Sequence, residues 1–91
     1  MKNYDEDYED YATIGDGAKI GEYARFGKYV EIGDNAIIGK YVAIGDSAEI
    51  GDSAEIGDSA KIGNNARFGK HVEIGDYAKI GDGARFGDKF R

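Results

Sequence analysis

Residues 48–59 read AEIGDSAEIGDS, one six-residue pattern written twice, and most of the chain varies the same pattern. Each copy holds a small residue, a variable residue, Ile or Phe, Gly, a polar residue and a turn former. Thirteen copies follow one another without a gap from Ala12 to Lys89: ATIGDG, AKIGEY, ARFGKY, VEIGDN, AIIGKY, VAIGDS, AEIGDS, AEIGDS, AKIGNN, ARFGKH, VEIGDY, AKIGDG and ARFGDK. A short fixed period of this kind is typical of a solenoid.

The even period decides which side chains face inward. Alternate residues of an extended strand point to opposite sides, so the small residue and the Ile or Phe two places later share the inner side. A helix does not fit this spacing, and a helix would lose roughly 1 kcal/mol at every Gly relative to Ala. Because all copies share one phase, the pattern predicts parallel strands that stack in coils.

The hexads resemble a known family. Ile14-Gly15-Asp16-Gly17-Ala18-Lys19, like the copies after it, has the order aliphatic, Gly-like, variable, variable, small, variable. This order resembles that of the hexapeptide-repeat proteins, which form a left-handed parallel β-helix. The resemblance implies an all-β, triangular solenoid of about four coils with three hexads each, and the handedness follows from the resemblance alone.

Residues eighteen apart are expected to stack in columns. The three expected core columns are Ile14, Ile32, Ile50, Phe68 and Phe86; then Ile20, Ile38, Ile56 and Ile74; then Phe26, Ile44, Ile62 and Ile80. Every Phe copy begins with Ala, whereas each Val precedes Ile, which indicates that the interior volume is constrained. We expect residues 12–89 to form the β-helix, residues 1–11 an N-terminal cap and residues 90–91 the C-terminal cap end.

Composition excludes several classes of function. The formal net charge of −6 disfavours nucleic acid and anionic membranes as partners, because both attract basic surfaces. The chain has no Cys, which rules out disulfides and thiolate metal sites. Since no long apolar run is present, we expect a soluble, cytoplasmic protein. We expect no cofactor, no metal and no small-molecule ligand.

His71 is the sole histidine and the one candidate for catalysis. In acyltransferases of the resembled family a single histidine acts as general base, and carbonic anhydrases of the γ class use three histidines on zinc. The repeat favours a structural interpretation, because Lys70-His71-Val72 matches Lys28-Tyr29-Val30 and Lys40-Tyr41-Val42. We therefore predict no catalytic residue and no enzyme.

The turn positions carry recurrent polar residues. Asp16, Asp34 and Asp52 are expected to stack in one turn column, where Asp favours turns, so we interpret them as solvated turn residues rather than calcium ligands. Asn35 and Gly17 at the next position fit a left-handed backbone. The tyrosines at that position, Tyr23, Tyr41 and Tyr77, fit it less easily, so we expect their turns to differ.

One outward patch is apolar. Ile37 is the only large apolar residue in any outward column, and Tyr23 and Tyr41 lie at the adjoining corner. This patch is the best candidate contact surface. It is compatible with a monomer or a homo-oligomer, and the resemblance implies a trimer.

The absence of insertions leads to a functional hypothesis. The resembled enzymes interrupt their hexads with a loop and add a C-terminal helix, and this chain has neither feature. We therefore predict a non-catalytic structural solenoid or scaffold, whose regularity is also typical of a designed or idealised repeat protein. The alternative is a minimal or fragmentary hexapeptide acyltransferase that acts as a homotrimer with His71 as general base.

Overall fold

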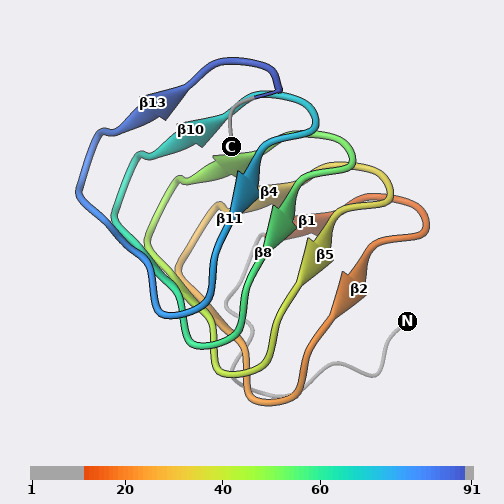
Figure 1. Cartoon of the computed structure of the whole chain (residues 1–91), viewed down its shortest axis with the longest axis horizontal. Coiled ribbons are helices and arrows are strands. Elements are labelled where there is room, and N and C mark those ends of the chain that lie inside the picture. The colour runs from red at the N-terminus through yellow and green to blue at the C-terminus, as the bar shows by residue number, and fades with distance from the viewer. Residues whose placement is uncertain (1–11, 90–91) are drawn as a thin grey trace.

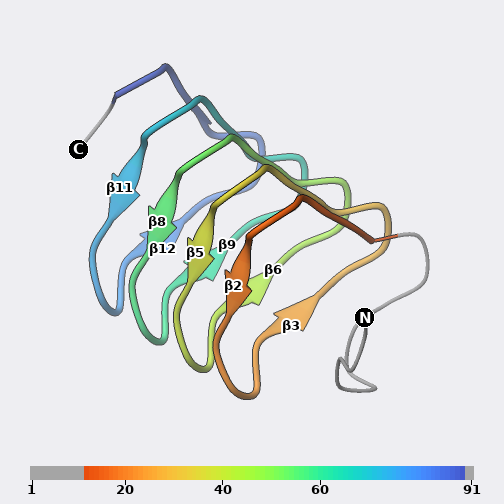
Figure 2. The same ribbon diagram turned by 90° about the vertical axis from the view of Figure 1, so that its right-hand side faces the viewer.

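Each hexad contributes one two-residue strand to a stacked coil with three faces, as Figures 1 and 2 show for residues 12–89, which the computed structural model describes. The first sheet contains β1 (Thr13–Ile14), β4 (Glu31–Ile32), β7 (Glu49–Ile50), β10 (Arg67–Phe68) and β13 (Arg85–Phe86). The second contains β2 (Lys19–Ile20), β5 (Ile37–Ile38), β8 (Glu55–Ile56) and β11 (Glu73–Ile74). The third contains β3 (Arg25–Phe26), β6 (Ala43–Ile44), β9 (Lys61–Ile62) and β12 (Lys79–Ile80).

All strand pairs are parallel and lie eighteen residues apart. Thr13 pairs with Glu31 and Ile14 with Ile32, and the same register continues to the last coil. The backbone N–H of Thr13, for example, donates to the Val30 carbonyl at 2.9 Å. Bonds of this kind join each coil to the next. The predicted all-β, left-handed parallel β-helix of about four coils is therefore confirmed.

The core consists of the predicted columns. Their Ile and Phe side chains and the small residues two places before them form one buried cluster, with the end coils partly buried. Phe68 and Phe86 stack in the first column with ring centroids 4.9 Å apart. Burial of each such side chain is worth about 1.5–3 kcal/mol.

Every corner of the coil has the same backbone conformation. The second turn residue of all thirteen hexads has a positive φ, including Tyr23 at 65° and Asn35 at 61°. The prediction that the tyrosine turns differ is therefore wrong. From Asn35 onward the N–H at this position donates to a carbonyl of the preceding coil, as from Tyr41 to Glu22 at 3.0 Å, and the corners of the first described coil have the same φ.

The aspartates of the turns join neighbouring coils. Eight hydrogen bonds run from a backbone N–H to the Oδ1 of an Asp or Asn eighteen residues later, for example from Lys40 to Asp58 at 3.0 Å. We call this series the carboxylate ladder. The sequence interpretation had these side chains in solvent, whereas they accept bonds from the backbone of the adjacent coil.

The predicted caps, residues 1–11 and 90–91, lie outside the described residues. Within residues 12–89 there is no helix of the length and hydrophobicity that a bilayer-spanning segment needs.

Candidate functional site

Three rows of corner residues run along the prism, one between each pair of faces. The first row contains Gly17, Asn35, Ser53, His71 and Lys89. The second row contains Tyr23, Tyr41, Ser59 and Tyr77. The third row contains Tyr29, Ser47, Asn65 and Gly83. Successive members lie one coil apart, so these rows place residues eighteen apart side by side.

His71 lies exposed in the first corner row, with a φ of 63°. Its backbone N–H donates to the Asp52 carbonyl at 2.9 Å, and the N–H of the adjacent Lys70 donates to Asp88 at 2.9 Å. Within residues 12–89 its imidazole makes no hydrogen bond or ion pair. The side chain is thus held on a well-fixed backbone with both ring nitrogens open to an incoming molecule.

The predicted contact patch is exposed. The side chains of Tyr23 and Tyr41 are each 59% exposed and that of Ile37 is 44% exposed. The two tyrosine rings stack on each other, with centroids 5.3 Å apart and an interplanar angle of 12°. Ile37 belongs to the second sheet, so it lies on the face adjoining these rings.

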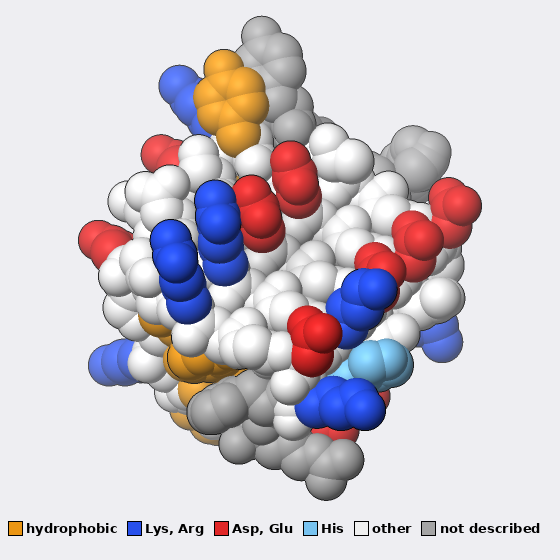
Figure 3. Space-filling view, turned by 90° about the horizontal axis from the view of Figure 1, so that it is seen from above, with side chains coloured by type: hydrophobic (Ala, Val, Ile, Leu, Met, Phe, Trp, Pro, Cys, Tyr) orange, Lys and Arg blue, Asp and Glu red, His pale blue; other side chains and the backbone are white. Residues whose placement is uncertain are grey.

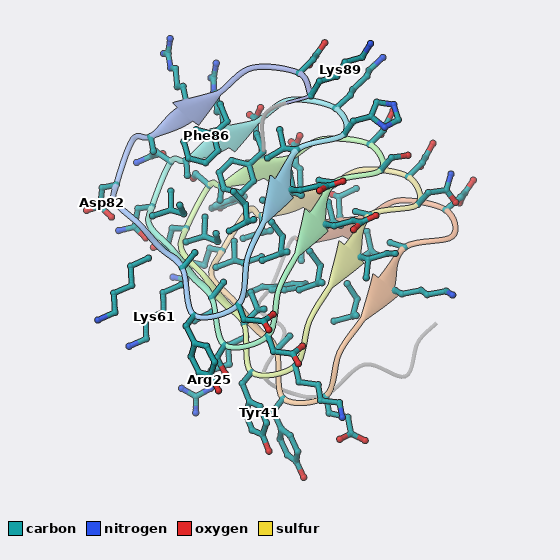
Figure 4. All side chains as sticks on the ribbon, viewed as in Figure 1. Arg25, Tyr41, Lys61, Asp82, Phe86 and Lys89 are labelled. Atoms are coloured by element: carbon teal, nitrogen blue, oxygen red, sulfur yellow. The ribbon has the colours of Figure 1, made fainter. Side chains whose placement is uncertain are left out.

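A shallow depression adjoins the tyrosine pair on the other side. It is lined by Tyr23, Arg25, Tyr41, Val42 and Ala43. Ala43 stands between Arg25 and Lys61 in the outward column of the third sheet, so its small side chain leaves a gap between two cations. Figure 4 shows Arg25, Tyr41 and Lys61 pointing outward from neighbouring parts of the ribbon.

Charge is arranged in short rows of one sign, which Figure 3 shows on one face of the molecule. Lys61 and Lys79 are register neighbours on the third sheet, and Glu55 and Glu73 are register neighbours on the second. On the first sheet the sign changes within the column, where Arg67 and Glu49 approach to 3.9 Å with both side chains exposed. An exposed pair of this kind contributes about 0–1 kcal/mol.

The acidic side chains do not gather into a metal centre in the part of the chain that the structure describes. No group of three or more His, Cys, Asp or Glu side chains there has an arrangement suited to a metal ion. Asp34 and Asp52, two members of the predicted turn column, serve as acceptors in the carboxylate ladder.

Residues 53–88 match the family described as bacterial transferase hexapeptide (six repeats). These residues carry the six-residue repeat of that family. The predicted resemblance to hexapeptide-repeat proteins is thereby confirmed. A comparison with curated proteins finds no significant match.

The solved structures that match this coil include acetyltransferases. The acetyltransferase domain of PglB from Neisseria gonorrhoeae FA1090 matches with a TM-score of 0.73 and 18% identity over 92% of this chain and 50% of that one. A variant of GDP-perosamine N-acetyltransferase from Caulobacter crescentus, in complex with CoA and GDP-perosamine, matches with a TM-score of 0.60 and 17% identity over 90% of this chain and 47% of that one. The chain thus spans about half the length of these structures.

These neighbours contradict the prediction that the chain is not an enzyme. That prediction relied on the turn pattern that His71 shares with Tyr29 and Tyr41, and on the absence of an interrupting loop and a C-terminal helix. The neighbours show that a coil of this shape makes up about half of an acetyltransferase, while the other half lies outside the matched region. A regular coil is therefore no argument against an enzyme.

Proposed function

We propose that this chain is the β-helical part of an acyltransferase, which moves an acyl group from coenzyme A to a nucleophilic amine or hydroxyl. The observation that carries the proposal is the match of 92% of the chain to an acetyltransferase domain at a TM-score of 0.73. The hexapeptide match over residues 53–88 supports the same class. The donor is suggested by the neighbour whose structure contains CoA.

We assign the role of general base to His71. Its exposed imidazole would accept the proton of the acceptor as that nucleophile attacks the thioester carbonyl. The new bond to the acyl carbon forms, the carbon–sulfur bond breaks, and the leaving thiolate takes the proton back from His71. A positioned base of this kind contributes about 10²–10⁴-fold to the rate.

We further propose that the site is completed in a homotrimer. His71 stands on a convex corner, where its own coil leaves the imidazole exposed to water. A second surface is needed to exclude water and to position donor and acceptor. The exposed Ile37 supports association, because a large apolar side chain in an outward column is free to pack against another copy.

Release of free thiol from acetyl-CoA tests the proposal, with a panel of amines that includes nucleotide-linked amino sugars. The variant of choice is His71→Asn, because Asn35 occupies the same corner row with a φ of 61°. The control is Tyr29→Asn, in the matching Lys-Tyr-Val turn with a φ of 65°. We expect His71→Asn to lose about 100-fold or more in rate. We expect Tyr29→Asn to retain the rate.

The outcomes separate the parts of the proposal. Equal turnover by the wild type and His71→Asn would refute the role of His71 and leave the acyltransferase class standing. A monomer by sedimentation with full turnover would refute the trimeric site. The absence of both turnover and donor binding would refute the proposed function itself.

A further inference from the structure

The second corner row has one serine, Ser59, where its other members are tyrosines. Its members are Tyr23, Tyr41, Ser59 and Tyr77, which share φ values of 65°, 63°, 65° and 64°. Tyr23 and Tyr41 stack at 5.3 Å, so tyrosines one coil apart in this row bring their rings together. Ser59 holds the next position with a side chain too short to continue the stack.

The spacing of the coils fits a third ring. Neighbouring strands lie about 4.8 Å apart, so the positions of Tyr41 and Tyr77 are separated by about 10 Å. A planar molecule midway between them would have each tyrosine about 5 Å away, within the range of about 4.5–7 Å that stacked aromatic pairs prefer. The floor of this gap is the Ser59 side chain, which is half-buried.

The large exposed fraction of Tyr77 indicates that no other side chain covers its ring. The side chain of Tyr77 is 74% exposed, against 59% for Tyr23 and for Tyr41, which cover one face of each other. Within residues 12–89 no ring stacks on Tyr77. Tyr41 and Tyr77 thus each have a ring face that no other ring of residues 12–89 covers.

Charge beside the gap favours an anionic substituent on the ring. Lys61 and Lys79 follow Ser59 and Tyr77 by two residues and are register neighbours on the third sheet. The depression beside Tyr41 opens towards this same sheet, over Ala43. Like charges side by side repel each other, so an anion near both amines would relieve that repulsion.

The nearby carboxylates of this corner are bound to backbone donors rather than to the two lysines. Asp58 and Asp76, at the same corner, accept backbone N–H bonds from Lys40 and Asp58 at 3.0 and 2.9 Å. Glu55 and Glu73 lie on the second sheet, around the corner from the two lysines. The two amines thus lie on the third-sheet side of the gap, and neither lysine forms an ion pair within residues 12–89.

We propose that Tyr41, Ser59 and Tyr77 form an aromatic slot that binds a planar aromatic anion. The ring lies between the two tyrosines and its carboxylate or phosphate lies beside Lys61 and Lys79. This replaces the expectation that the chain has no small-molecule ligand. The slot lies in a different corner row from His71, so the proposal does not depend on acyl transfer.

Titration of the full chain with 2-naphthoate, followed by NMR, tests the slot. We expect saturable shifts at Ser59, Lys61 and Tyr77. The neutral 2-naphthamide should bind about three- to tenfold more weakly, because it lacks the charge that the two exposed amines attract. Cyclohexanecarboxylate, which has the charge without a flat ring, should bind at least about tenfold more weakly.

Two variants make the test specific. Ser59→Tyr fills the slot with a residue that the row already accommodates three times, and it should abolish 2-naphthoate binding. The matched control, Ser47→Tyr, makes the same change in the third row at a φ of 62° and should bind like the wild type. If Ser59→Tyr fails to fold, Tyr77→Ser removes one wall and should weaken binding about tenfold.

Three results would overturn the proposal. They are an absence of saturable 2-naphthoate binding to the wild type, undiminished binding to a folded Ser59→Tyr or Tyr77→Ser variant, and equal or tighter binding of 2-naphthamide. The last result would assign the site to neutral rings and refute the role of the two lysines. Failure of acyl transfer would leave all these readouts unchanged.

Discussion

A Cβ on Gly33 would lie 2.5 Å from the Oδ1 of Asp52, which accepts a hydrogen bond of 2.9 Å from the backbone N–H of Asp34. The missing side chain of one coil thus leaves the space through which the carboxylate of the next coil reaches its backbone donor. The same relationship recurs between Gly39 and Asp58 and between Gly57 and Asp76. It explains physically why Gly and Asp stand side by side in the repeat.

The carboxylate ladder predicts a difference between two substitutions of Asp58. Asp58→Ala removes the acceptor of the Lys40 N–H and should lower the free energy of unfolding by about 1 kcal/mol. Asp58→Asn keeps an Oδ1 acceptor, like Asn64, which accepts from the Asp46 N–H. It should leave the free energy of unfolding nearly unchanged. Thermal unfolding measures both, and equal midpoints for the two variants would show that the bond contributes nothing.

Glycine is required only where a further coil stacks. A Cβ on Gly51 would lie 2.5 Å from the carbonyl carbon of Gly69, whereas one on Gly81 meets nothing within 4 Å. We expect Gly51→Ala to destabilise the fold by several kcal/mol, since the contact is with backbone, and Gly81→Ala to have little effect. Chemical denaturation decides between these outcomes, with the outward Glu49→Gln as a neutral reference. Similar losses in Gly51→Ala and Gly81→Ala would refute the packing explanation.

The positive φ of the corner residues predicts which side chains fit at these positions. Ser47 has a φ of 62°, a conformation that Asn tolerates better than other side chains. We expect Ser47→Asn to leave stability unchanged or raise it, and Ser47→Val to lower it by about 1–2 kcal/mol because a branched side chain is strained there. The measurement is the midpoint of thermal unfolding. A Val variant as stable as the Asn variant would contradict the conformational argument.

Ile37 is predicted to support self-association. Ile37→Lys places a charge on the exposed apolar site and should shift the sedimentation mass towards the monomer while the circular dichroism spectrum stays unchanged. Glu55→Lys, on the next strand of the same sheet, controls for the added charge. An unchanged mass in Ile37→Lys would place the interface elsewhere.

The fold was predictable because one period governs it. The columns of Ile14, Ile20 and Phe26 follow from a spacing of eighteen, and the structure confirms their register. The corner of Tyr41 was predicted wrongly, because residue preference was weighed without the coil-to-coil bond that fixes its φ. The bonds of Asp58 between coils were missed for the same reason, since only the stacked structure supplies their donors.

Function was less accessible from the sequence. The pattern of Lys70-His71-Val72 described a turn correctly, yet the regularity of the repeat led to a prediction of no enzyme, which the acetyltransferase neighbours contradict. The aromatic slot was present in the sequence as the row Tyr41, Ser59 and Tyr77, and reading the corner residues as rows would have found it. The idealised or designed origin of the repeat stays a prediction.

The most direct test of the proposed acyltransferase is calorimetric titration with acetyl-CoA, because donor binding does not depend on knowing the acceptor. The proposal predicts saturable binding that persists in Ser59→Tyr, since His71 and the aromatic slot lie in different corner rows. No saturable binding of acetyl-CoA to the wild-type chain would contradict the proposal.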